Sequence, residues 1–258
     1  MSSPRLPGAF KIGSDHKQPH QIKNTILLGL PSRESELLLK NLEYIEMDPP
    51  FALHEAGEPL KFAYFINSGL ASVLTVMEDS KSVEVGLAGT EGFIGMPLVA
   101  GLSSSSTRVI MQVGGSAYRI SAKNFTAALT RCPSLVQRLT RYNLELGLQS
   151  MHVAACNRLH EVDERLARWL LMSQDRLGGD LVPLTQDFLA HMLGTRRASV
   201  TVAAGILQRA GLITYNRGHV QINDRAGLEN SSCECYASMQ QQLRNWEKEA
   251  KSPALRTR

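Results

Sequence analysis

Residues 184–213 read LTQDFLAHMLGTRRASVTVAAGILQRAGLI, and this stretch decides how the C-terminal part of the chain folds. Thr185 is a good N-cap, and the apolar residues that follow it recur at helical spacing. Gly194 can take the left-handed conformation that ends a helix, and Thr195 is placed to cap a second one. The inward stripe of that second helix is Val200, Ala203, Ala204 and Leu207. The stretch therefore predicts two helices around one glycine.

The outward surface at the start of the second predicted helix is small or cationic. It carries Arg196, Arg197, Ala198, Ser199, Thr201 and Val202. A pair of arginines adds positive charge where the helix dipole is already positive, so it favours an anion at that end. Within residues 184–222 Asp187 is the only acid, against four arginines. Such a helix can enter the major groove of DNA, where arginine binds guanine O6 and N7 with two hydrogen bonds.

Residues 214–222 predict two short strands joined by an Asn-Arg-Gly-His turn, which resembles the wing of a winged helix-turn-helix. Arg217 and His219 would lie at its tip, where a cation or a donor can contact a phosphate. The alternative is a pair of packed helices in an ordinary α-domain, with the two arginines exposed to solvent. The candidate DNA contacts are Thr185, Thr195, Arg196, Arg197, Ser199, Thr201, Val202, Arg217 and His219.

Two further helices are predicted upstream of this region. Apolar residues step by four and three along the first, in a heptad seam made of Leu135, Leu139, Tyr142, Leu146, Gln149, Val153 and Cys156. The seam predicts a long helix that pairs with its twin in a second copy of the chain. The alternative is an amphipathic helix packed on its own domain. The second helix follows over about 157–176, and on its outer side we expect Glu161, Glu164, Arg165 and Arg168.

The region between about Leu42 and Ile120 has the pattern of β-strands. Short apolar runs alternate with polar residues, as in the segment that begins at Phe62, which is the period of two expected when one sheet face is buried. Turn residues such as Asn67-Ser68-Gly69 recur about every 8–12 residues. This part of the chain therefore predicts a sandwich or barrel of short antiparallel strands.

The composition is that of an ordinary folded protein. The chain has 258 residues, 43% of them hydrophobic and 20% charged, and this length favours two domains. No apolar run is long enough for a membrane helix, and the first twenty residues are polar and contain three prolines. We therefore expect a cytoplasmic protein with a loose N-terminal tail and no membrane partner. The net charge of +4 permits a polyanionic partner without requiring one.

The order β-roll, long helix, second helix and winged helix-turn-helix resembles the Crp/Fnr family of bacterial transcription regulators. The resemblance rests on the stretch quoted first and on the segments HEAGE (54–58) and FAYFINSG (62–69), and it spans about residues 25–235. It implies an α+β homodimer that binds a near-palindromic operator, contacts RNA polymerase and can hold a small-molecule effector. The implied division is a tail (1–24), a β-roll (25–132), a dimerisation helix (133–156), a winged helix-turn-helix (157–235) and a second tail (236–258). Residues 241–258 hold five cations against two acids, and we expect them to be frayed.

The family's base-reading positions fall on Arg197, Ala198 and Val202 of this sequence. Only Arg197 keeps a hydrogen-bonding side chain, so the operator should differ from that of the catabolite-activator-like members. Val202 or Ala198 can instead contact a thymine methyl group.

The effector pocket departs further from the family pattern. A cyclic-nucleotide cassette has a Gly-Glu pair followed by Arg-Ser-Ala or Arg-Thr-Ala, and here Met96 replaces the glutamate. The remaining candidates are Gly95, Thr107 and Arg108, and cyclic-AMP binding is not predicted.

No cofactor or metal is predicted. The iron–sulfur cluster of Fnr-type members needs N-terminal cysteines, and no cysteine precedes Cys132. Cys233 and Cys235 are too few ligands for a closed zinc site and are interpreted as packing residues. Haem needs only one histidine, but none is singled out.

Two other functions are alternatives to a DNA-binding regulator. A cupin-like metal enzyme needs clustered histidines and carboxylates, whereas the roll offers only His54 beside Glu55 and Glu58, so we predict no enzyme. A dimeric ligand-sensing module that does not bind DNA is opposed by the positive charge of residues 184–222.

Overall fold

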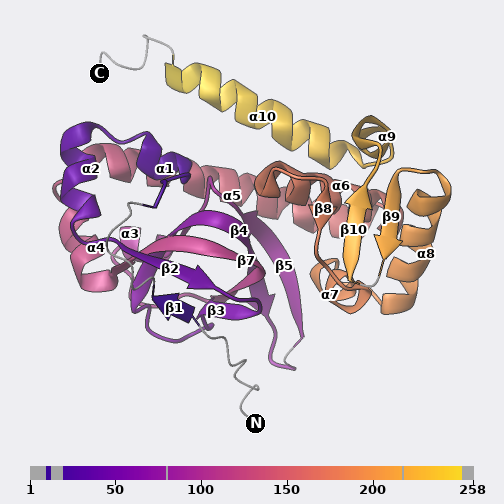
Figure 1. Cartoon of the computed structure of the whole chain (residues 1–258), viewed down its shortest axis with the longest axis horizontal. Coiled ribbons are helices and arrows are strands. Elements are labelled where there is room, and N and C mark those ends of the chain that lie inside the picture. The colour runs from indigo at the N-terminus through magenta and orange to yellow at the C-terminus, as the bar shows by residue number, and fades with distance from the viewer. Residues whose placement is uncertain (1–9, 13–19, 80, 217, 252–258) are drawn as a thin grey trace. The chain divides into compact units, whose positions relative to one another are not determined.

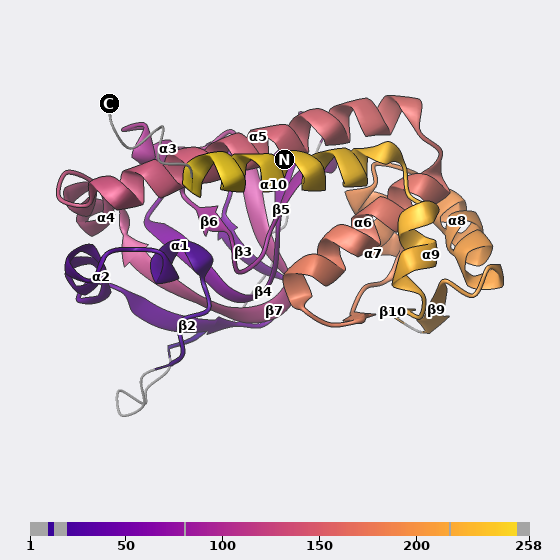
Figure 2. The same ribbon diagram turned by 90° about the horizontal axis from the view of Figure 1, so that it is seen from above.

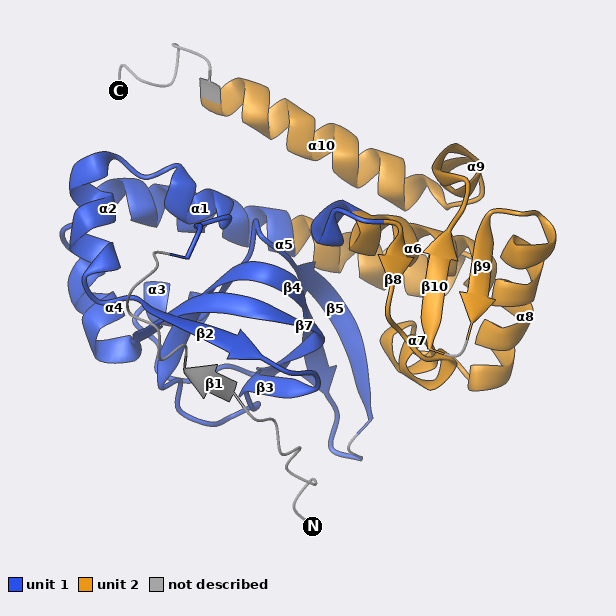
Figure 3. Ribbon diagram, viewed as in Figure 1, with its two compact units in different colours: residues 1–146, 175–179 blue, residues 147–174, 180–258 orange. Residues whose placement is uncertain are grey.

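The computed structural model describes residues 10–12, 20–79, 81–216 and 218–251 (Figure 1). The chain forms two compact units (Figure 3). One comprises residues 1–146 and 175–179, and the other residues 147–174 and 180–258. The predicted α+β class is confirmed, as is the chain order of antiparallel sheet, long helix and winged helix-turn-helix. None of the described helices combines the length and the apolar character that a membrane span requires.

The first unit is built on one antiparallel sheet. Its strands are β1 (Phe10–Ile12), β2 (Glu43–Met47), β3 (Phe51–His54), β4 (Phe62–Val76), β5 (Ser82–Ala88), β6 (Phe93–Ile94) and β7 (Thr107–Ser121). The order is β1-β2-β7-β4-β5, with β3 paired to β7 and β6 paired to β4. The segment Asn67-Ser68-Gly69, expected to be a turn, lies inside β4. The register to β7 shifts there, and Gly69 has a φ of 85°, so these residues bend one long strand.

Helices pack at one end of this sheet, as Figures 1 and 2 both show. They are α1 (Thr25–Leu28), α2 (Ser32–Leu39), α4 (Ala122–Leu129) and the first part of α5 (Pro133–Leu159), while α3 (Met96–Val99) follows β6. Aromatic rings packed against one another form the centre of the core between them. The Phe93 ring lies 4.9 Å from that of Phe65 and 5.1 Å from that of Phe125.

Part of the predicted N-terminal tail packs on this unit. Asn24 is fully buried, caps α1, and donates hydrogen bonds to the carbonyl oxygens of Ile66 and Gly92. The His20 ring stacks on Tyr44 with centroids 3.7 Å apart. The tail we expected to be loose therefore contacts the sheet at residues 10–12 and 20–24, whereas residues 1–9 and 13–19 lie outside the described residues.

The predicted dimer seam on α5 turns inward in this structure. Leu135, Leu139 and Tyr142 belong to the buried core of the first unit, and Leu146 packs against the second buried cluster of that unit. Gln149, Val153 and Cys156 are buried as well. Apolar residues that repeat about every 3.5 residues are typical both of a coiled coil and of a helix that packs on its own core. These residues are therefore buried within the chain, as the alternative interpretation, an amphipathic helix packed on its own domain, requires.

The second unit continues from α5 through α6 (Val162–Leu177), β8 (Leu181–Val182), α7 (Gln186–Met192), α8 (Arg197–Arg209), β9 (Ile213–Asn216), β10 (His219–Ile222), α9 (Arg225–Asn230) and α10 (Glu234–Lys251). Its three strands are antiparallel in the order β8-β10-β9. Helix α6 is buried on all sides from Arg165 to Gln174, so Arg165 and Arg168 do not lie on an outer face as expected. The expectation of a frayed tail over 241–258 is wrong for residues 241–251, which belong to α10, and residues 252–258 lie outside the described residues.

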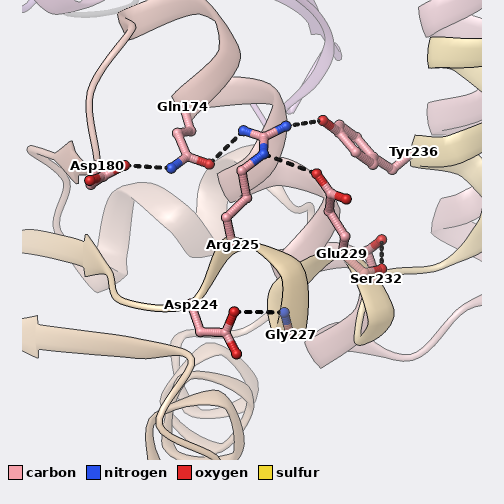
Figure 4. A network of polar contacts seen from close by, with 8 residues as sticks. All are labelled: Gln174, Asp180, Asp224, Arg225, Gly227, Glu229, Ser232 and Tyr236. Atoms are coloured by element: carbon pink, nitrogen blue, oxygen red, sulfur yellow. Dashed lines mark hydrogen bonds and ion pairs between the residues drawn. The ribbon is translucent and has the colours of Figure 1, made fainter.

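Arg225 holds three helices of this unit together (Figure 4). Its guanidinium donates to Gln174 Oε1 on α6 at 2.7 Å, to Glu229 Oε1 on α9 at 2.9 Å and to the Tyr236 hydroxyl on α10 at 2.6 Å. Gln174 in turn donates to Asp180 at 2.7 Å. Because charged hydrogen bonds are stronger than neutral ones, this network fixes the first turn of α10 against α6 and α9.

Candidate nucleic-acid interface

The turn between α7 and α8 is set by backbone hydrogen bonds. Thr185 caps α7 as predicted, its side-chain oxygen accepting from the Phe188 N–H at 3.2 Å. Gly194 has the predicted positive φ, at 57°. The Gly194 N–H donates to His191 O and the Thr195 N–H donates to Ala190 O, which are the two bonds of a Schellman motif.

This turn places the start of α8 one residue later than expected. Thr195 belongs to the capping turn that follows α7. The N-cap of α8 is Arg196, and its side chain makes no capping hydrogen bond. The expectation that Thr195 caps α8 is therefore wrong. Without a side-chain cap, the first N–H groups of α8 remain available to an external acceptor, and the dipole at that end favours an anion.

The exposed face of α8 carries most of the predicted DNA contacts. Arg196, Arg197, Thr201 and Val202 are exposed and Ser199 is half-buried, whereas the predicted inward residues Val200, Ala203, Ala204 and Leu207 are buried. Val202 is an apolar side chain that is 63% exposed. The helix thus presents donors and one apolar group on the same surface.

The first turn of α7 contacts this face. Asp187 Oδ1 lies 3.4 Å from Arg197 Nε, and both side chains are about two-thirds exposed, at 68% and 65%. An exposed ion pair is worth about 0–1 kcal/mol, so Arg197 can exchange it for another partner. The Thr201 hydroxyl donates to Gln186 Oε1 at 2.9 Å, which joins the two helices.

The wing lies beside these helices. Strands β9 and β10 pair as predicted, with His219 opposite Asn216 and exposed. A Cβ on Gly218, in the turn of the wing, would lie 3.8 Å from Thr185 Cγ2, so the turn adjoins the start of α7. Arg217 lies outside the described residues.

Sequence patterns did not reveal the groups that hold this interface in place. The Tyr215 N–H on the wing donates to Gln208 Oε1 of α8 at 3.0 Å, and the Tyr215 hydroxyl donates to Leu184 O at 3.4 Å. The Arg165 guanidinium donates to Leu193 O at the end of α7 and to Asn157 Oδ1 at 2.8 Å. No motif signals these pairs, because their members lie 7 to 31 residues apart.

The predicted effector-pocket residues lie on different parts of the sheet. Gly95 has a φ of 126° and packs against Ala63, near the start of β4. Thr107 and Arg108 pair with Thr75 and Leu74 near the end of the same strand. Arg108 Nε lies 3.1 Å from Glu55 Oε2, so its charge already has a partner within the roll.

His54 of the roll is a half-buried neutral histidine. Its pKa is lowered to about 4, mainly because burial disfavours the charged ring, although a hydrogen bond with the backbone of Thr107 acts in the opposite direction. Neither His54 nor its neighbours Glu55 and Glu58 are among the ligand side chains that converge in the described residues.

One group of ligand side chains does converge, in the second unit. It consists of Cys156, His160, Cys233 and Cys235. The pKa of the Cys156 thiol is lowered to about 4, above all by its hydrogen bond with Cys233, and the Arg168 charge adds to the effect. The interpretation of Cys233 and Cys235 as an isolated pair is incomplete, because α5 brings a third cysteine and a histidine to them.

Comparisons with known proteins bear on both units. Residues 164–231 match the family model of the Crp-like helix-turn-helix domain. A search of curated protein sequences found no match. Among solved structures, the chain is similar to a protein described as a Crp/Fnr-family transcriptional regulator of Eubacterium rectale, with 15% identity and a TM-score of 0.63 over 81% of this chain and 98% of that one.

Two further structures share the fold. FixK2 of Bradyrhizobium japonicum has 14% identity and a TM-score of 0.63 over 74% of this chain and 98% of that one. CLP of Xanthomonas campestris, described as a c-di-GMP-responsive global regulator, has 16% identity and a TM-score of 0.62 over 75% of this chain and all of that one. At such identities the likeness establishes the fold.

Proposed function

This chain has a Crp-like helix-turn-helix domain within a Crp/Fnr fold, and from this premise we propose that it is a transcriptional regulator that binds a near-palindromic operator as a homodimer. The observation that carries the proposal is the surface of α8. It combines a helix start without a side-chain cap, two exposed arginines and an exposed valine, and α8 is hydrogen-bonded to α7 and to the wing.

Base recognition is assigned to the outward side chains of α8. Arg197 is held only by an exposed pair with Asp187, and it can exchange that carboxylate for the O6 and N7 of a guanine. Val202, which is 63% exposed, and Ala198 beside it are suited to a thymine methyl group. The operator half-site should therefore contain both a guanine and a thymine in major-groove contact with the protein.

Contacts with the DNA backbone are assigned to the groups around this face. The first N–H groups of α8 and the Arg196 side chain would bind one phosphate, in a geometry in which backbone donors and the helix dipole act together. Ser199 and Thr201, with Thr185, Thr195, Arg217 and His219 at the helix start and wing, are proposed as further phosphate contacts. Such contacts set the register of the protein on the duplex.

The dimer contact is assigned to the outward face of α5. Leu144 and Met151 are 56% and 65% exposed, and with Leu148 and Ala155 they step by four, three and four residues along the helix. This spacing forms a second apolar seam, on the side opposite the buried one. We assign the twin helix of a second copy to this face, in place of the seam at Leu135–Val153.

The proposal also includes an effector bound by the roll and a contact with RNA polymerase. Both belong to the mode of action that the fold supports, and neither has an assigned residue here. Transcription from a promoter that contains the operator, with and without candidate small molecules, would measure both.

The experiment that tests DNA binding is a salt series. Duplexes that bind the full-length protein would be selected from a random pool, and affinity for the selected sequence and for a scrambled one would be measured by fluorescence anisotropy. A dimer that neutralises 6–10 phosphates should lose about 10³–10⁵ in affinity between 50 and 200 mM salt. If neither duplex binds in a salt-dependent manner, the chain is the alternative, a ligand-sensing module that does not bind DNA.

A further inference from the structure

Three cysteines and one histidine converge in the second unit from segments far apart in the sequence. Cys156 lies near the end of α5 and His160 just after it, while Cys233 precedes α10 and Cys235 lies in its first turn. Cys156 Sγ lies 3.5 Å from Cys233 Sγ, and Cys235 Sγ lies 3.7 Å from His160 Nδ1. All four ligand atoms lie within 4.8 Å of one another, and the three cysteines are at most 4% exposed.

The two distances of 3.5 and 3.7 Å match the ligand shell of a single tetrahedral ion. Bond lengths of about 2.3 Å to sulfur and about 2.0–2.1 Å to nitrogen place tetrahedral ligand atoms about 3.5–3.8 Å apart. A disulfide would require about 2.05 Å between two sulfur atoms, and all four cysteines of the chain are free thiols. In a four-iron cluster each cysteine binds a different iron, which would spread the sulfur atoms more widely than the 3.5 Å between Cys156 and Cys233.

The surroundings of the histidine fit a metal ligand. Glu234, which lies between Cys233 and Cys235 in the sequence, accepts a hydrogen bond from His160 Nε2 at 3.0 Å. This bond holds the imidazole proton on Nε2 and leaves the Nδ1 lone pair directed at the three sulfur atoms. A carboxylate behind a ligating histidine is the usual outer partner in zinc sites, where it fixes both the tautomer and the ring orientation.

A buried cation balances the charge of the cluster. Arg168 of α6 is 2% exposed, and its guanidinium interacts with the Cys156 sulfur. Three thiolates and one divalent ion carry a net charge of −1, which Arg168 neutralises.

We propose that Cys156, His160, Cys233 and Cys235 bind one zinc ion in a closed structural site that joins the end of α5 to the start of α10. Three thiolates and one imidazole are a standard ligand set for structural zinc, and all four positions are occupied by protein, which leaves none for a substrate. The ion would cross-link α5 to α10. The other helices in contact with the start of α10, α6 and α9, are joined to it by the Arg225 network. The site is independent of the assignment of DNA contacts to α8.

The test measures metal in the full-length protein, purified without an affinity tag under reducing conditions. Elemental analysis and native mass spectrometry should find about one zinc per chain. Cys235→Ser should lose it, whereas Cys132→Ala should retain it, because Cys132 is a buried cysteine of the other unit. Full zinc content in Cys235→Ser, or acid-labile sulfide with iron in the wild type, would overturn the proposal.

Two measurements remain informative if a cysteine variant fails to fold. Glu234→Gln keeps all four ligands and an exposed side chain, and it should weaken zinc binding about 10–100-fold in a competition assay with a chelator. Wild-type protein stripped of metal and loaded with Co²⁺ should show the intense visible absorption of tetrahedral cobalt together with thiolate charge-transfer bands. A wild-type protein that contains no zinc and gives no such spectrum has a cluster of packed thiols, and the proposal is then wrong.

Discussion

Arg197 shows how little holds a recognition side chain in the free protein. Its ion pair with Asp187 spans 3.4 Å on the surface, and it projects from the first turn of a helix that has no side-chain cap. Its neighbours on the inner side, Val200 and Ala203, are fully packed. The residue is therefore free to change partner while the helix beneath it stays fixed.

Replacing Arg197 by alanine should separate base recognition from simple charge. We expect the loss of about 1–3 kcal/mol in binding to the selected operator and little change on random duplex, because a bidentate contact with guanine is lost. Arg209→Ala, at the exposed end of the same helix, is the matched control and should have a smaller effect on the operator. Equal losses on both duplexes would make Arg197 a phosphate contact.

His54 should make the roll sensitive to mild acid. Its folded-state pKa of about 4 lies below the ordinary 6.5, so the unfolded chain takes up a proton first as the pH falls. Its contribution is present above pH 6.5 and is lost between 6.5 and about 4, on the order of 3 kcal/mol. Chemical denaturation of the wild type and of His54→Asn across this range should show a shallower pH slope in the variant. Identical slopes would contradict this assignment.

Helix α5 shows what an element's pattern does and does not predict. The heptad spacing identified the helix and its buried side correctly as an apolar seam, but could not tell whether its own core or a second copy covers that seam. The seam shares its buried cluster with residues such as Phe65 and Phe93, which lie on strands far from α5 in the sequence. The outward seam gives a weaker signal than the buried one, because it has only four members, Leu144, Leu148, Met151 and Ala155, and the last of them is small.

The two sides of α5 should respond differently to substitution. Met151→Glu on the outward face should convert a dimer to a monomer in sedimentation analysis with little change in unfolding free energy. Leu139→Ala on the buried face should instead cost about 2–5 kcal/mol of stability, because it leaves a cavity in the core. A monomeric Leu139→Ala protein of unchanged stability would restore the buried seam as the dimer contact.

Local signals predicted the turn between α7 and α8 well, and distant contacts escaped them. Thr185 and Gly194 act through hydrogen bonds to residues three or four positions away, which sequence spacing shows directly. Cys156 and Cys233 are 77 residues apart, and nothing in the chain between them signals that they meet. Gly69 was expected in a turn. A glycine with positive φ occurs both in turns and in β-bulges, so the sequence alone does not distinguish the two.

At the scale of the whole molecule, the proposal requires two copies of α8 to reach successive turns of one face of the duplex. The half-sites should therefore lie about 10–10.5 base pairs apart, centre to centre. Inserting five base pairs between them moves one half-site to the opposite face, and affinity should fall to that of a single half-site. Anisotropy titrations of the two duplexes would measure this. Unchanged affinity would show that each copy binds alone.

The bare start of α8 has a consequence for the evolution of this protein. An aspartate or serine at position 196 would complete the helix end and make the unliganded protein more resistant to heat. The same change would remove a cation from the place where the duplex backbone is expected, and an aspartate would repel it. At residue 196, a side chain that raises thermal stability would therefore lower the affinity for the operator. Arg196 favours binding to the nucleic acid.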